Sequence, residues 1–80
     1  MLKVRKPADN PDPKERLFEN AVLDTICLEG YDWANGMCQA WRIATGTEYV
    51  LSTVDGMKGT HLARIYYEDG RSKAEIIVND

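Results

Sequence analysis

Residues 61–78, HLARIYYEDGRSKAEIIV, place the dipeptide Asp69-Gly70 between two runs rich in aromatic and β-branched residues. Asp-Gly is a favoured two-residue hairpin turn, because its backbone tolerates the positive φ angles that such a turn requires. A hairpin about this turn sets four pairs on one face: Glu68 with Arg71, Tyr66 with Lys73, Arg64 with Glu75, and Leu62 with Ile77. Three of the four pairs are complementary in charge or cation–π character, so we predict that this face meets water.

The opposite face of this hairpin is nearly all apolar, and the alternation predicts that it packs on the core. Its members are His61, Ala63, Ile65, Tyr67, Ala74, Ile76 and Val78. His61 is the single histidine of the chain. A lone histidine at the start of a core strand indicates a structural residue more than a catalytic one.

Upstream of the hairpin, residues 12–30 carry the signals of a helix. Asp12 suits the N-cap, Pro13 suits the first helical position, and Gly30 suits the stop. Most apolar side chains between them fall on one side of a helical wheel. The polar side of the wheel holds Arg16, Glu19, Asn20 and Asp24. We therefore predict an amphipathic helix that lays its apolar side on the sheet.

A second hairpin is predicted between these two elements. The runs MCQAWRIA (37–44) and TEYVLSTV (47–54) flank Thr45-Gly46, which suits a tight turn. Trp41 lies opposite Val50 or Leu51 according to the length of the loop, and the sequence leaves both registers open.

The predicted fold class is α+β: one N-terminal amphipathic helix packed on a four-stranded antiparallel meander, with an optional short N-terminal edge strand at residues 2–5. A chain of 80 residues holds one domain at most. Residues 1–11 are rich in proline and lack a sustained period, so we expect an extended N-terminal arm followed by a single α+β domain over residues 12–80.

Ten basic and thirteen acidic residues give a net charge of -3. This balance argues against the basic footprint of most nucleic-acid-binding domains. No apolar run approaches the length of a membrane span, and the start of the chain lacks the apolar segment of a secretory signal. We expect a cytoplasmic protein with no membrane partner.

The chain offers little for catalysis. Cys27 and Cys38 are expected to be reduced and buried, although their spacing also permits a bridge. Together with one histidine they provide too few ligands for zinc, so we predict no metal. The carboxylates occupy helix-surface, turn and loop positions, and no nucleophile is paired with a base. We predict that the protein is not an enzyme and needs no cofactor.

The segment GYDWANGMCQAW, residues 30–41, gathers aromatic side chains about Asn35-Gly36, which we interpret as a turn. Trp41 is assigned to the core. The predicted partner-binding residues are Tyr31, Asp32 and Trp33, with Asp55, Met57 and Lys58 from a glycine-rich tip at the same end of the sheet. Aromatic side chains dominate protein interfaces because they bury much area at little entropic cost. In the alternative, Trp33 covers the end of the helix as part of the core.

These observations predict a small non-enzymatic protein–protein interaction module whose partner is a host protein or protein complex. In size and composition it is similar to the compact acidic proteins with which phages and mobile elements inhibit host complexes stoichiometrically, anti-CRISPR proteins among them. One alternative is a domain that binds single-stranded nucleic acid through Arg64, Tyr66, Arg71 and Lys73 on the sheet. A second is a regulatory subunit that homodimerises through an unpaired edge of the strand at 71–78.

Overall fold

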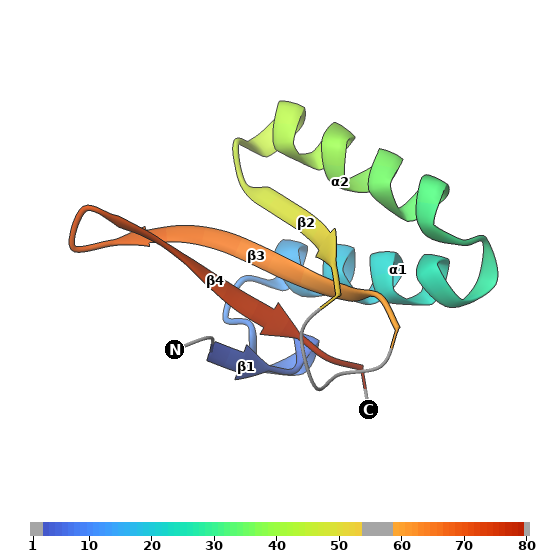
Figure 1. Cartoon of the computed structure of the whole chain (residues 1–80), viewed down its shortest axis with the longest axis horizontal. Coiled ribbons are helices and arrows are strands. Elements are labelled where there is room, and N and C mark those ends of the chain that lie inside the picture. The colour runs from blue at the N-terminus through green and yellow to red at the C-terminus, as the bar shows by residue number, and fades with distance from the viewer. Residues whose placement is uncertain (1–2, 54–58, 80) are drawn as a thin grey trace.

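The computed structural model describes residues 3–53 and 59–79, which form two α-helices, a short 3-10 helix and four strands (Figure 1). In chain order these are β1 (Lys3–Arg5), η1 (Pro7–Asp9), α1 (Pro13–Leu28), α2 (Tyr31–Thr45), β2 (Glu48–Ser52), β3 (His61–Glu68) and β4 (Arg71–Ile77). The strands make one sheet in the order β1-β4-β3-β2, parallel between β1 and β4 and antiparallel elsewhere. The α+β class is confirmed. The prediction of an all-antiparallel meander is wrong, because the N-terminal strand joins the sheet in parallel.

The hairpin β3–β4 has the register that the sequence predicts, including the pairs Glu68–Arg71 and Leu62–Ile77. Asp69 has φ 55° and Gly70 has φ 75°, so both turn residues adopt the left-handed conformation of a two-residue hairpin loop. The register predicted from the Asp-Gly turn is therefore confirmed.

The prediction of a solvent-exposed hairpin face is wrong for the part of the hairpin that packs on the core cluster. Leu62 and Ile77, expected on the solvent face, are fully buried and share a core cluster with Val22 and Leu23 of α1. The helix therefore covers the face that also carries Arg64 and Glu75. These charged side chains are compatible with burial because they are paired with residues from other elements.

The other face of the sheet points toward the viewer in Figure 1, with α1 behind it. Ala63 and Ile76 are buried there as predicted, but Tyr67 is 78% exposed and Val50 of β2 is 38% exposed. His61, at the start of β3, is half-buried. Apolar alternation thus identified a real apolar face, but not the face on which the helix packs.

Helix α1 begins as expected. Asp12 is the N-cap, and its carboxylate accepts a hydrogen bond of 2.9 Å from the backbone N–H of Lys14. The predicted helical face is rotated, because Leu17 is 68% exposed whereas Glu19 is completely buried. A buried carboxylate requires compensating partners.

Arg5 of β1 supplies that compensation and ties three elements together. Its guanidinium donates two hydrogen bonds to Glu19, of 2.8 and 2.5 Å, and a third to Glu75 of β4. The amide of Asn10 and the hydroxyl of Tyr49 also donate to Glu19, at 3.1 and 2.5 Å. Residues 3–10 are therefore attached to the fold by this buried ionic cluster.

The largest correction concerns residues 31–45, which form helix α2 instead of a turn and a strand. Ala34, Met37, Cys38 and Trp41 recur at helical spacing and pack on the core cluster. Burial of these helically spaced side chains outweighs the β-propensity of residues 37–44. The structure therefore has two helices where the sequence predicted one.

The two supposed turns of this region have other roles. Asn35-Gly36 lies inside α2. Gly46, at φ 79°, caps the C-terminus of α2, and its N–H donates to the carbonyl of Arg42 at 2.8 Å. The predicted hairpin of 37–44 with 47–54 is absent, and β2 pairs with β3 instead.

Helix α2 packs against β2, the edge strand of the sheet, and against α1 (Figure 1). The rings of Phe18 and Trp41 stack between the two helices with centroids 4.2 Å apart. At the other edge β1 pairs with residues 75–77 of β4, so the predicted free edge of the strand at 71–78 is wrong for that part, whereas residues 71–74 pair with β3 alone among the described strands.

Candidate partner-binding surface

A tight corner joins the two helices and exposes the first turn of α2. Only Glu29 and Gly30 separate the helices, and their N–H groups both donate to the carbonyl of Thr25, at 2.8 and 3.0 Å. Gly30 has φ 98°, a conformation that is costly for residues with a Cβ. The corner brings the end of α1 next to the start of α2.

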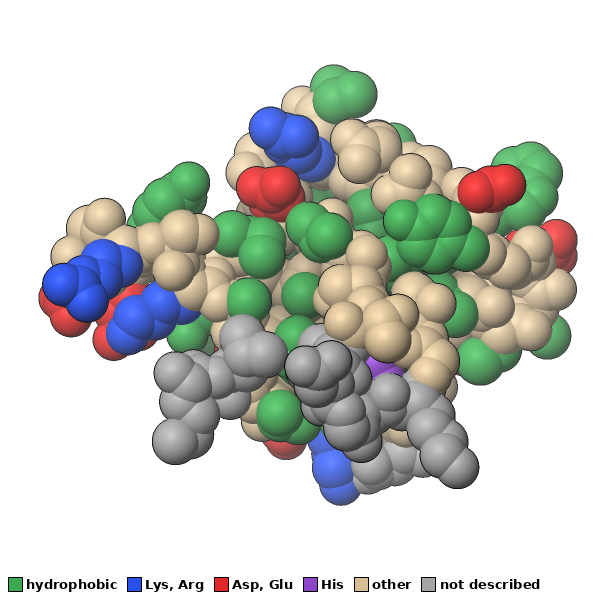
Figure 2. Space-filling model, in the orientation of Figure 1, with side chains coloured by type: hydrophobic (Ala, Val, Ile, Leu, Met, Phe, Trp, Pro, Cys, Tyr) green, Lys and Arg blue, Asp and Glu red, His purple; other side chains and the backbone are tan. Residues whose placement is uncertain are grey.

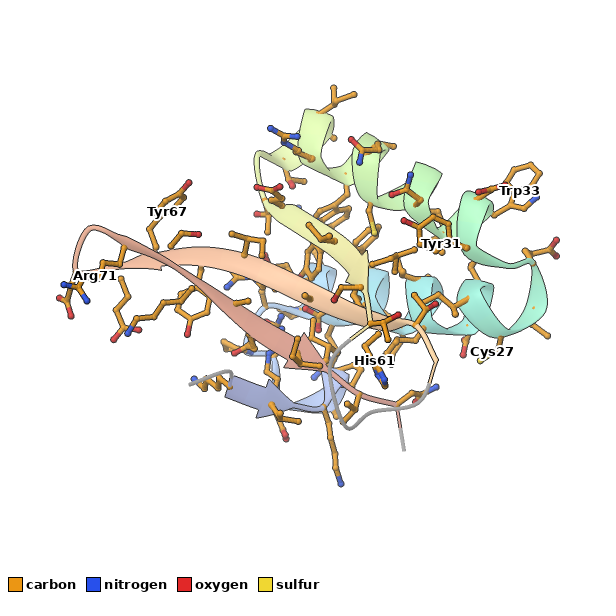
Figure 3. The ribbon with its side chains drawn as sticks, in the orientation of Figure 1. Cys27, Tyr31, Trp33, His61, Tyr67 and Arg71 are labelled. Carbon is orange, nitrogen blue, oxygen red and sulfur yellow. The ribbon has the colours of Figure 1, made fainter. Side chains whose placement is uncertain are left out.

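Large apolar side chains project into solvent from this corner. Trp33 is 69% exposed, Tyr31 is 51% exposed and Leu28 is 81% exposed. Figure 3 shows both side chains on α2, with Trp33 pointing outward, away from the sheet. Trp33 therefore does not cover the helix end as part of the core.

An apolar hollow of about 510 Å³ lies beside Trp33 on the outer surface of α2. Its lining residues share one side of the helix: Asp32, Trp33, Gly36, Met37 and Ala40. We call this surface the Trp33 groove. The small residues Gly36 and Ala40 create the recess, and the larger side chains of Trp33 and Met37 bound it.

Gly36 has no structural role in the described fold that requires a glycine. Its φ lies outside the left-handed region, and a Cβ built on it would meet nothing within 4 Å. Glycine inside a helix costs about 0.5–1 kcal/mol relative to alanine. The absent side chain opens the groove without improving the packing of the fold.

The groove is fixed in place by the buried side of the same helix. Ala34 and Cys38 are 0% and 1% exposed and belong to the core cluster. Burial raises the pKa of the Cys38 thiol to about 11, so this thiol is neutral at physiological pH. Cys27 on α1 is exposed, and neither cysteine is in a disulfide.

The segment that carries the groove is acidic up to Arg42 in the last turn of α2. Residues 17–41 contain no lysine or arginine. Their acidic residues are Glu19, which Arg5 neutralises, and the exposed Asp24, Glu29 and Asp32. On the face drawn in Figure 2, acidic and apolar side chains share the right-hand end, whereas the basic side chains lie elsewhere.

Of the residues predicted to bind a partner, Tyr31, Asp32 and Trp33 lie together in the first turn of α2. Asp55, Met57 and Lys58 lie outside the described residues. Gly36, Met37 and Ala40 were missed, because the segment was interpreted as a turn followed by a strand. Their spacing from Trp33, at i+3, i+4 and i+7, is the helical signal that identifies them.

The residues of the nucleic-acid alternative lie along the β3–β4 hairpin. Arg64 is on the face covered by α1, where its Nη2 atom is 3.5 Å from the Glu15 carboxylate. Lys73 lies 3.6 Å from Glu68, and Arg71 is at the hairpin tip. Tyr66, which lies between Arg64 and Glu68 in β3, is half-buried. Two of the three basic side chains, Arg64 and Lys73, thus form ion pairs with carboxylates.

A second hollow, of about 220 Å³, is polar and lies over the buried ionic cluster. It is lined by Lys3, Arg5, Asp9, Asn10, Pro11, Asp12, Glu15, Arg64 and Glu75. Its inner carboxylates, Glu15 and Glu75, are bound by Arg64 and Arg5. Within residues 3–53 and 59–79, no three His, Cys, Asp or Glu side chains are placed to hold a metal ion.

None of the described helices combines the length and the apolar character needed to cross a bilayer. The chain matches no protein-family model, no curated protein and no solved structure.

Proposed function

We propose that this chain is a small non-enzymatic module that binds a partner protein through the Trp33 groove. The observation that carries the proposal is a tryptophan that is 69% exposed beside an apolar hollow of about 510 Å³. Tryptophan is among the residues most enriched in binding hot spots, and exposing it to water is unfavourable.

Two further features support this proposal. The groove lies on a helix whose opposite side is anchored in the core, so little conformational entropy is lost when a partner binds. Gly36 opens the recess although alanine would suit the helix better and would fit without a clash. Both features suit a preformed surface that receives side chains from another protein.

The narrower form of the proposal is a stoichiometric inhibitor of a host complex, of the kind encoded by phages and mobile elements. The size and acidity of the chain support it. Such a protein acts by occupying a surface, so inhibition should be complete at one equivalent.

The test compares two exposed aromatic side chains at opposite ends of the molecule, Trp33 and Tyr67 (Figure 3). The tagged wild type, Trp33→Ala and Tyr67→Ala are used to capture partners from the native host. The captured protein is then purified and titrated with each variant. Because a hot-spot residue contributes about 2 kcal/mol or more, Trp33→Ala should weaken binding about 30-fold, whereas Tyr67→Ala should leave it unchanged.

Equal binding by the two variants would contradict the proposal. So would a bound nucleic acid that is released by moderate salt and by Arg71→Ala, which is the outcome expected of the nucleic-acid alternative. Turnover of a substrate beyond one equivalent would show that the protein is an enzyme.

A further inference from the structure

We infer that the occupant of the Trp33 groove is a basic amphipathic helix of the partner protein. This inference rests on the proposed function and specifies the chemistry of the partner.

The shape of the groove favours a helix. Its lining residues extend from Asp32 to Ala40 along one side of α2, which is about 12 Å at a rise of 1.5 Å per residue. Small side chains at Gly36 and Ala40 permit two helix backbones to approach closely, with the ridges of one in the grooves of the other. Leucine, isoleucine or methionine side chains of the occupant would fill the space that Gly36 leaves open.

Strand addition is a poorer match for this site. The groove lies on the exposed side of a helix, where backbone N–H and C=O groups are already bonded within α2. The nearest strand, β2, pairs with β3 on one side, and α2 packs against it. An extended peptide would therefore find no row of free backbone groups in the groove.

The charge of the surface favours a cationic occupant. Asp32 lines the groove itself, Glu29 and Asp24 are exposed near the same corner, and no lysine or arginine occurs in residues 17–41. Lysine or arginine beside the apolar ridge of the partner would meet these carboxylates. The exposed indole of Trp33 offers a further contact for such a cation. A second copy of the chain, with its own net charge of -3, is less complementary.

The inference is tested with two capped 18-residue model helices. Both helices carry leucine at positions i, i+3, i+4 and i+7. The remaining positions are mainly lysine in the first helix and mainly glutamate in the second. Binding is measured by calorimetry and by the emission of Trp33 in a Trp41→Phe background. The lysine helix should bind at 1:1 with a blue shift of Trp33, and at least about tenfold more tightly than the glutamate helix.

Three variants locate the contact. Gly36→Leu fills the recess and should abolish binding of the lysine helix. Asp32→Asn should weaken it about two- to fivefold, as expected for one partly exposed ion pair. Glu68→Gln removes the same charge beside Arg71, its strand partner, which Figure 3 shows at the opposite end of the molecule from Trp33, and should change the affinity little.

The possible failures are distinguishable. Equal binding of both helices overturns the cationic occupant but leaves the groove as a binding site. If neither helix binds while the purified partner still depends on Trp33, the helix inference fails and the proposed function stands. Binding of the lysine helix that ignores Gly36→Leu overturns the inference, since it reflects general attraction to an acidic protein. Self-association that buries Trp33 identifies a second copy as the occupant and also overturns it.

Discussion

The hydroxyl of Tyr49 donates a hydrogen bond of 2.5 Å to the carboxylate of Glu19, and both side chains are shielded from water. Burial, together with the hydrogen bond and charge of Glu19, raises the pKa of Tyr49 above its usual range. The same carboxylate is held by the forked guanidinium of Arg5. Beside the apolar core, the domain thus contains a buried ionic cluster in which Arg5, Asn10 and Tyr49 all donate to Glu19.

Removing Arg5 should therefore destabilise the protein strongly. Arg5→Met leaves the buried Glu19 without a cation and leaves Glu75 with only the exposed Lys3, so we expect a loss of about 3–5 kcal/mol in the free energy of unfolding in urea. Lys3→Met is the control: Lys3 is 3.9 Å from Glu75, but its side chain is 68% exposed, so its loss should change stability by less than about 1 kcal/mol. Equal effects of the two variants would contradict the role of Arg5.

Gly36 inside α2 and Gly46 at its C-cap should respond to alanine in opposite directions. Gly36→Ala should stabilise the protein by about 0.5–1 kcal/mol, because the helix is favoured and the new Cβ meets nothing within 4 Å. Gly46→Ala should destabilise it by about 1–2 kcal/mol, because Gly46 has φ 79° at the C-cap. Thermal melts of both variants test this pair. A destabilising Gly36→Ala would indicate that position 36 is tightly packed.

The two tryptophans should separate function from stability. Trp33→Ala should leave the free energy of unfolding within about 0.5 kcal/mol of the wild type, since most of this side chain is already in water. Trp41→Ala removes the stack on Phe18 and should cost about 2–3 kcal/mol. Acrylamide should quench mainly the emission of Trp33. A large loss of stability in Trp33→Ala would make that variant unsuitable as a binding probe.

The two thiols should differ in reactivity and in their effect at alkaline pH. Iodoacetamide should label the exposed Cys27 quickly and the buried Cys38 only after unfolding. The pKa of Cys38 is raised from 9.0 to about 11, so between these values the unfolded chain loses a proton that the folded chain keeps. Stability should therefore fall as the pH rises from 9 to 11.

Urea unfolding at intervals across this pH range measures the slope, with Cys38→Ala as the control. In that variant the fall between pH 9 and 10 should diminish. The raised pKa of Tyr49 should still reduce stability above pH 10 in both proteins, because the unfolded tyrosine ionises there first. An unchanged slope in Cys38→Ala would show that this thiol ionises normally.

The parts of the fold that the sequence predicted depend on local chemistry. The N-cap at Asp12 and the turn at Asp69-Gly70 each follow from a few neighbouring residues, and both were predicted correctly. Helix α2 was missed because Asn35-Gly36 is usually a turn signal, whereas here the packing of Ala34 and Cys38 prevails over it.

The faces of the sheet could not be assigned from alternation. Arg64 and Glu75 suggest a solvated face, and only the positions of Glu15 and Arg5, 49 and 70 residues away in the sequence, explain their burial. The candidate site was half identified for a related reason. Tyr31, Asp32 and Trp33 stand out by composition, but Gly36 and Ala40 acquire a role only when residues 31–45 are a helix.

The parallel pairing of Lys3 with Glu75 joins two segments that are far apart in the chain, so β1 can dock on the sheet only after β4 has been made. Before β4 is made, Arg5 can bind Glu19 but not Glu75, so the ionic cluster is incomplete. Closing a loop of nearly the whole polypeptide is slow compared with forming the local hairpin, so attachment of β1 is expected to be the final folding step.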